Sequence, residues 1–215
     1  MIEVHPPNEP VHSWRDFFVH LATITIGLMI ALSLEGCVEW IHHKHLVHAA
    51  QASLQVEIEA NAKELQKALD DVSAEQKQLA EDVAILEKMI ANPKLPDPGA
   101  PKILFELPTF NDVSWETAKN TGALSYMPYE EAHQYSDIYK QQDEVDVAEH
   151  QAASDAVLSF APMVNREHIS PKVRPEDAPM VKQRIEVLQA RLYVLESLIH
   201  NLGEKYKTFL LVHPE

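Results

Sequence analysis

The residues of this chain best suited to chemistry are histidines. The 215-residue sequence contains twelve, and four of them, His42, His43, His45 and His48, follow Trp40 closely. On a helix, His45 and His48 share a face, because side chains three positions apart are neighbours. Imidazoles with a nearby carboxylate are good zinc ligands, and imidazole changes its charge near about pH 6.5. The cluster therefore predicts either a polar collar at one end of an apolar helix or a metal- or pH-sensing site.

A second arrangement, Glu-x-x-His, occurs at Glu39/His42 and at Glu130/His133. Di-iron bundles use this spacing on two helices and add a glutamate from each of two others. The apolar rows of the predicted helices carry no carboxylate, so those two further ligands are missing. The sequence also contains no HExxH motif, no glycine-rich phosphate loop and no nucleophile elbow. We therefore predict a protein that is not an enzyme and has no cofactor or resident metal.

Composition narrows the classes of partner. Lys plus Arg total 18 and Asp plus Glu total 33, which gives a net charge of −15. Nucleic-acid binding requires a basic face for the phosphates, and no Lys/Arg cluster occurs, so a nucleic-acid partner is excluded. Only five glycines occur among many good helix formers, and the single cysteine, Cys37, excludes an internal disulfide. The composition favours a helical protein with an acidic, solvated surface.

An apolar stretch near the N-terminus has the length of a membrane span. Trp14 and Trp40 stand at its two ends. At about 1.5 Å per residue, their separation corresponds to roughly 39 Å, close to the thickness of a bilayer with its interfaces. Tryptophan prefers those interfaces. We therefore predict an N-terminal tail, a transmembrane helix and an extramembrane domain, at residues 1–14, 15–41 and 42–215.

One stripe of this helix could contact another helix. Thr23, Gly27, Ala31 and Glu35 recur every four residues, and small residues allow a second helix to approach closely. A carboxylate facing lipid is costly, so we expect Glu35 to face a partner helix or the interfacial water. The stripe predicts association with a second copy or with another membrane protein. Alternatively, Glu35 or Glu39 forms an acidic ring in an oligomeric channel.

Cleavage before Cys37 is a rival interpretation of the apolar stretch. The sequence Leu34-Glu35-Gly36-Cys37 partly resembles a lipoprotein processing site. However, Glu35 stands where that pattern has a small residue, and Arg15 is the only Lys or Arg before the apolar run. The retained transmembrane helix is therefore preferred.

Three long helices are predicted in the rest of the chain, at about 42–91, 128–160 and 178–212, with proline-rich connections at 92–109 and 161–177. Apolar residues recur at alternating steps of four and three, which is the heptad pattern. In the first helix the predicted row is Ile58, Ala62, Leu65, Leu69, Val72, Gln76, Leu79, Val83, Leu86 and Ile90. The second helix has a weaker row, Tyr135, Ile138, Gln142, Val145, Ala152 and Ala156. The row of the third helix is Val181, Ile185, Leu188, Leu192, Leu195, Ile199, Leu202, Tyr206 and Phe209. We predict an all-α fold in which the transmembrane helix continues into an antiparallel, coiled-coil-like three-helix bundle whose helices alternate in direction.

A short helix is predicted between the first two long ones. The segment "TFND" at 109–112 resembles a helix-start capping pattern, and Gly122 is a typical residue beyond a helix end. We expect Trp115, inside this helix, to pack into the core.

Two stretches, "HLATITIGLMIALSLEGCVEW" and "SWETAKNTGALSYM", resemble a loose group of uncharacterised bacterial single-pass membrane proteins. In that group an apolar helix is followed by Glu and Trp, and a helical domain carries a Trp-Glu-x-Ala…Gly-Ala-Leu turn. The resemblance implies the bacterial inner membrane, with the helical domain on the periplasmic side, and supplies no catalytic residues. The basic residues flanking the span, Arg15 and Lys44, are balanced and leave the orientation open.

These patterns predict a non-enzymatic, single-pass membrane protein that acts as a helical scaffold, adaptor or accessory subunit. Its expected partners are the lipid bilayer and either a second copy or another membrane protein. Two alternatives stay open. A channel or transport component requires Glu35 to face a central axis, and a sensor requires the histidine cluster to respond to zinc or pH.

Overall fold

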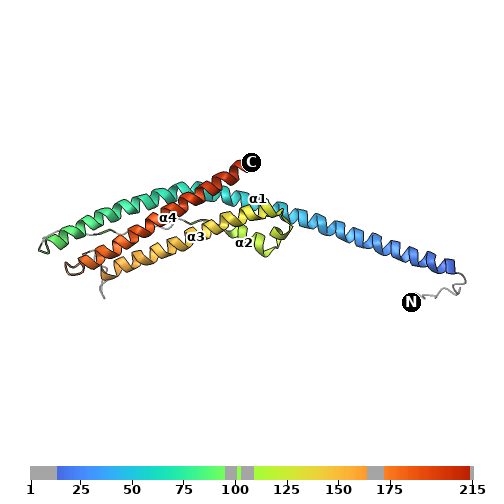
Figure 1. Cartoon of the computed structure of the whole chain (residues 1–215), viewed down its shortest axis with the longest axis horizontal. Helices are drawn as coiled ribbons and strands as arrows, with labels where there is room; N and C mark the ends of the chain where they lie inside the picture. Colours follow the sequence, from blue (N-terminus) through green and yellow to red (C-terminus); the bar gives the residue numbers. More distant parts are fainter. Residues whose placement is uncertain (1–13, 95–100, 103–108, 164–171, 214–215) are drawn as a thin grey trace, which may run out of the picture. The chain divides into compact units, whose positions relative to one another are not determined.

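A computed structural model describes residues 14–94, 101–102, 109–163 and 172–213 of the chain. In this part every regular element is a helix, so the all-α prediction is confirmed (Figure 1). The elements are α1 (Trp14–Ala91), α2 (Val113–Asn120), η1 (Ala123–Tyr126), α3 (Tyr129–Phe160), η2 (Ala161–Met163) and α4 (Ala178–Val212), where η marks a 3-10 helix. The chain forms two compact units, Met1–Ala49 and Ala50–Glu215, and α1 contributes to both.

The length of α1, 78 residues, follows from its composition. After Gly36 the sequence contains no glycine or proline until Pro93, so nothing interrupts the ladder of backbone hydrogen bonds. Asp16 in the first turn and Lys88 in the last turn have the signs that the helix dipole favours. The helix ends at Ala91, just before Pro93.

The second unit is a bundle in which α3 and α4 lie beside the part of α1 that follows Ala50 (Figure 1). Polar contacts show that α4 is antiparallel to α1. Gln76 Nε2 lies 2.9 Å from Glu196 Oε2, and Glu87 Oε1 lies 3.5 Å from Lys182 Nζ, so residue numbers rise on one helix as they fall on the other. The predicted three-helix bundle is present.

By contrast, α1 and α3 run in the same direction. Gln51 Nε2 bonds to Glu131 Oε1 at 2.6 Å, and Asn61 Nδ2 to Gln142 Oε1 at 3.2 Å, so residue numbers rise together. The expectation that the long helices alternate in direction along the chain is therefore wrong for this pair. Two parallel helices require a connection that runs back along the bundle.

The described parts of that connection contact α1 at two positions along its length. The Lys102 N–H lies 3.0 Å from each carboxylate oxygen of Asp82, late in α1. Farther along the connection, the Asn111 N–H donates to Asn61 Oδ1 at 2.8 Å, about six turns earlier on the same helix. The connection therefore returns along α1 and delivers α2 to the opposite end of the bundle.

The core follows the predicted apolar rows of α3 and α4 completely and that of α1 only in part. Buried α3 and α4 positions are Tyr135, Ile138, Gln142, Val145, Ala152, Ala156, Val181, Ile185, Leu188, Leu192, Leu195, Ile199, Leu202, Tyr206 and Phe209. Burying a large apolar side chain of this kind contributes about 1.5–3 kcal/mol. On α1, Ile58, Val72, Leu79 and Leu86 are buried as expected.

Six positions of the predicted α1 row are not buried. Ala62, Leu65, Leu69, Gln76 and Val83 are half-buried, and Ile90 is exposed. The buried positions are instead Asn61, Ala68, Asp82 and Met89. Asn61 and Asp82 are polar because they bind the returning connection. The spacing of apolar residues alone does not reveal such core positions.

Candidate functional site

The first candidate site is the apolar part of α1. Ile24, Leu28 and Leu34 are 70%, 60% and 64% exposed. Among the described residues, α1 is the one helix long and apolar enough to cross a membrane, judged by length and composition, and none of its most apolar window is buried. A core helix of a soluble domain would be covered by neighbouring elements.

The hydroxyl groups of this stretch are satisfied within the helix itself. Each donates to the carbonyl four residues earlier: Thr23 to Val19 (2.8 Å), Thr25 to Leu21 (2.8 Å) and Ser33 to Met29 (2.7 Å). Backbone and side-chain polar groups in hydrocarbon must find such internal partners. These three hydroxyl groups are therefore compatible with an apolar surrounding.

The predicted helix-packing stripe lies on an open surface. Its members, Thr23, Gly27, Ala31 and Glu35, are all exposed. A Cβ atom at Gly27 would meet nothing within 4 Å. The predicted interfacial anchors are exposed as well, and Lys44 Nζ lies 4.7 Å from the ring centroid of Trp40. A partner helix on this stripe stays a prediction.

The histidine cluster is held by α1, with the ring centroids of His42 and His43 6.0 Å apart. In the part of the chain that the structure describes, no three His, Cys, Asp or Glu side chains are placed to hold a metal ion together. The Glu130/His133 pair likewise gains no further ligand there. Zinc binding at His42, His43, His45 or His48 stays a prediction.

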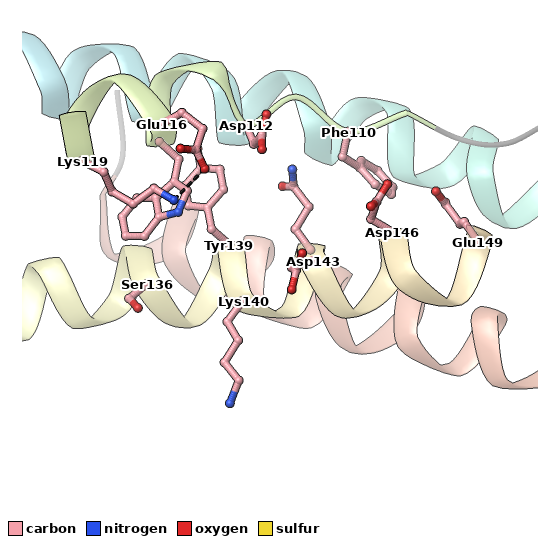
Figure 2. A pocket seen from close by; sticks show the side chains of 12 residues that line it. Phe110, Asp112, Glu116, Lys119, Ser136, Tyr139, Lys140, Asp143, Asp146 and Glu149 are labelled. Carbon is pink, nitrogen blue, oxygen red and sulfur yellow. Dashed lines mark hydrogen bonds and ion pairs between the residues drawn. The ribbon is translucent and has the colours of Figure 1, made fainter. Parts of the chain in front are cut away.

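The second candidate site is a cavity of about 520 Å³ in the bundle, between α3 and the segment that leads into α2 (Figure 2). Five carboxylates line it: Asp112, Glu116, Asp143, Asp146 and Glu149. The lining lysines are Lys119 and Lys140. Lys119 Nζ lies 2.6 Å from Glu116 Oε1, and Figure 2 shows Lys140 pointing away from the other side chains. The cavity therefore has a strong excess of negative charge.

A stacked aromatic pair forms one wall of this cavity. The rings of Trp115 and Tyr139 are 5.0 Å apart and inclined by 4°. Tyr139 OH donates to Glu57 Oε1 at 2.6 Å, and the Ser114 N–H donates to Glu57 Oε2 at 2.8 Å. Trp115 is half-buried and lines the cavity, so it does not pack fully into the core as expected. The helix cap differs, because Asp112 makes no side-chain cap and Glu57, from α1, accepts from the first turn of α2 instead.

A polar clamp holds the same segment on the bundle; it consists of the buried side chains of Asn61, Gln142 and Tyr206 and of the backbone of Asn111, an exposed residue. Asn61 donates to Asn111 O at 2.7 Å and accepts from Asn111 N at 2.8 Å. Gln142 Nε2 donates to Asn111 O at 2.9 Å, and Tyr206 OH donates to Gln142 Oε1 at 2.8 Å. Burial raises the pKa of Tyr206 above its ordinary value, so its hydroxyl stays a donor. The clamp joins α1, α3, α4 and the connection.

Glu149 stands out among the carboxylates of the cavity. It is 4% exposed, and its Oε1 has no hydrogen-bond partner within the described residues. Burial raises the pKa of Glu149 to about 8, and the negative charge of Asp146 adds to this effect. The expectation that the helix rows carry no carboxylate is therefore wrong, since Glu57 and Asp82 are buried as well.

The unfolding free energy is expected to fall as the pH rises from about 5 to about 8.5. Burial raises the pKa of Glu149 to about 8 and that of half-buried Glu75 to about 7, so the folded chain binds these protons more tightly than the unfolded chain does. This stabilisation is complete below the ordinary glutamate pKa and is lost as the pH rises through the two raised values. Urea unfolding followed by circular dichroism measures it.

Glu149→Gln should reduce that fall by about 3 kcal/mol, because the glutamine does not titrate. Glu144→Gln is the matched control, since Glu144 is an exposed carboxylate of the same helix. It should leave the dependence on pH unchanged. Equal slopes for wild type and Glu149→Gln would contradict the prediction.

Comparisons of the chain with protein-family models, curated proteins and solved structures gave no match. The two candidate sites must therefore be interpreted from their own geometry. Those sites are an exposed apolar helix and an acidic, aromatic-walled cavity held by the polar clamp.

Proposed function

We propose that this chain is a non-enzymatic, single-pass membrane protein in which residues 15–41 of α1 span the bilayer. The bundle would then serve as a scaffold or adaptor beside the membrane. The observation that carries the proposal is the exposure of the entire apolar stretch of α1. Such a long exposed apolar surface needs a cover, and a bilayer supplies one of matching thickness.

Continuity of α1 supports an anchoring role for this stretch. The same helix that carries the apolar residues supplies Leu54, Ile58 and later core positions of the bundle. No glycine or proline lies between the predicted span and this core, so the anchor and the domain share one element. A segment removed by cleavage would not need to be part of the domain's longest helix.

Helix–helix association is the proposed mode of action, with a second copy of the chain as the first candidate partner. The stripe through Gly27 and Ala31 is exposed and lacks bulky side chains. Helices in lipid associate through close contact at such small residues rather than through the hydrophobic effect. Glu35 would then lie beside the partner helix instead of facing lipid.

The test is to express the full chain in bacteria, wash the membranes with alkaline carbonate and measure the native mass of the detergent-extracted protein. We expect the chain to remain in the membrane pellet at its full intact mass and to form a homo-oligomer. Recovery in the soluble fraction, or a chain that begins at a lipid-modified Cys37, would overturn the membrane-spanning proposal. A monomeric mass would overturn self-association.

A pair of variants tests whether the oligomer forms through the stripe. Gly27→Leu places a bulky side chain on the stripe, whereas Ile26→Leu changes a neighbouring face without changing its bulk. The first should dissociate the oligomer and the second should preserve it, as judged by native mass in the same detergent. Equal masses for both variants would place the interface elsewhere.

A further inference from the structure

We propose that the acidic cavity between α3 and the segment leading into α2 binds an aliphatic polyamine, an elongated cation with several ammonium groups. This site lies wholly within the second unit, so the proposal is independent of the membrane-spanning helix. It follows from the charge of the cavity, from one buried unpaired carboxylate and from the aromatic wall.

The charge of the cavity selects a cation. Lys119 is held by Glu116, and Lys140 points away (Figure 2). Asp112, Asp143 and Asp146 are exposed carboxylates along the same cavity. Like charges gathered in a concave site favour binding of the opposite charge.

Glu149 supplies the independent evidence for a ligand. Its side chain lines one end of the cavity, it is 4% exposed, and its Oε1 has no hydrogen-bond partner within the described residues. A buried carboxylate without a donor is costly. An ammonium group beside the Glu149 side chain would supply N–H donors and a compensating charge to its carboxylate.

The aromatic wall and the shape of the site favour an organic cation over a metal ion. Trp115 and Phe110 line the cavity, and Lys119 Nζ already lies 5.4 Å from the centroid of the Trp115 ring. Ammonium groups bind well over aromatic rings, and because Tyr139 and Lys119 already cover Trp115, a ligand ammonium group would displace Lys119 or lie beside Phe110. Among the described residues no three carboxylates or histidines converge as metal ligands do. The volume of about 520 Å³ lies within the range typical of small-molecule sites.

Isothermal titration of the purified full chain in detergent with spermidine is the test. The buffer is set at about pH 8.5, above the raised pKa of about 8 of Glu149, where alkylamines stay protonated. We expect saturable binding that Glu149→Gln weakens at least about tenfold, because a charge-assisted hydrogen bond is lost. Glu144→Gln, which alters an exposed carboxylate of α3 outside the cavity lining, should bind as wild type does.

A second variant keeps the test informative even if Glu149→Gln does not fold. Asp143 and Asp146 are exposed, so Asp143→Asn/Asp146→Asn should leave the fold intact, as circular dichroism would verify, and should also weaken binding. Absence of spermidine binding to wild type would overturn the proposal. So would equal binding of magnesium, equal weakening by Glu144→Gln, or tighter binding of a lysine-rich peptide, which would indicate a protein partner instead.

Discussion

Replacing Ile24 and Leu28 together by arginine is expected to release the protein from carbonate-washed membranes. Both side chains lie in the middle of the exposed apolar stretch of α1, on one face of the helix. An arginine at the centre of a transmembrane helix costs about 2.5–3.5 kcal/mol, so two cost about 5–7 kcal/mol. This corresponds to more than about a thousandfold change in the insertion equilibrium. The measurement is the fraction of chain in the supernatant.

The matched control is Val157→Arg/Val194→Arg. These valines are 69% and 57% exposed on α3 and α4, so the control adds the same two charges to the bundle without touching the apolar stretch. It should partition as wild type does. If Ile24→Arg/Leu28→Arg also stays in the pellet, with the bundle folded by circular dichroism, the apolar stretch does not hold the protein in the membrane.

Much of the fold could be predicted from the sequence because helices are local. The absence of glycine and proline between Gly36 and Pro93 and the regular apolar steps of α4 are local features of the sequence. Every predicted core position of α4, from Val181 to Phe209, is buried. The direction of α3 could not be predicted in this way, because it depends on where the connection after α1 travels.

The polar residues of the core could not be predicted from the apolar spacing either. Asn61 and Asp82 sit at core positions of α1 because they bind the backbone of the returning connection. Neither residue belongs to the apolar row predicted for α1. One signal was present: Asn61, Ala68, Asp82 and Met89 are separated by multiples of seven, and so are Gln142, Glu149 and Ala156. A heptad pattern followed without regard to polarity would have placed Asn61, Gln142 and Glu149 in the core.

The polar clamp also determines the shape of the acidic cavity. The cavity lies between α3 and the segment from Phe110 to Lys119, and that segment is attached to the bundle through Asn111 and Ser114. These attachments are hydrogen bonds to Asn61 and Glu57 of α1. Loss of either should therefore change both the stability of the bundle and the position of the Trp115 ring.

Asn61→Ala is accordingly expected to lower the unfolding free energy by about 1–3 kcal/mol. Asn61 is 1% exposed and its amide makes bonds of 2.7, 2.8 and 3.2 Å to Asn111 and Gln142. Asn111 O and Gln142 Oε1 keep their bonds from Gln142 Nε2 and Tyr206 OH, so the Asn111 N–H is the group that loses its partner, at a cost of about 1–3 kcal/mol. Lys63→Ala, at an exposed position on the same helix, should change stability by less than about 0.5 kcal/mol. Urea unfolding at about pH 6 gives both values.

A double-mutant cycle distinguishes a connected clamp from separate bonds. Tyr206→Phe removes one hydroxyl, whose acceptor, Gln142 Oε1, also accepts from Asn61. If the clamp acts as one network, the effects of Asn61→Ala and Tyr206→Phe should deviate from additivity by about 0.5 kcal/mol or more. Additive effects would mean that α4 does not share in holding the connection, and that the cavity depends on α1 and α3 alone.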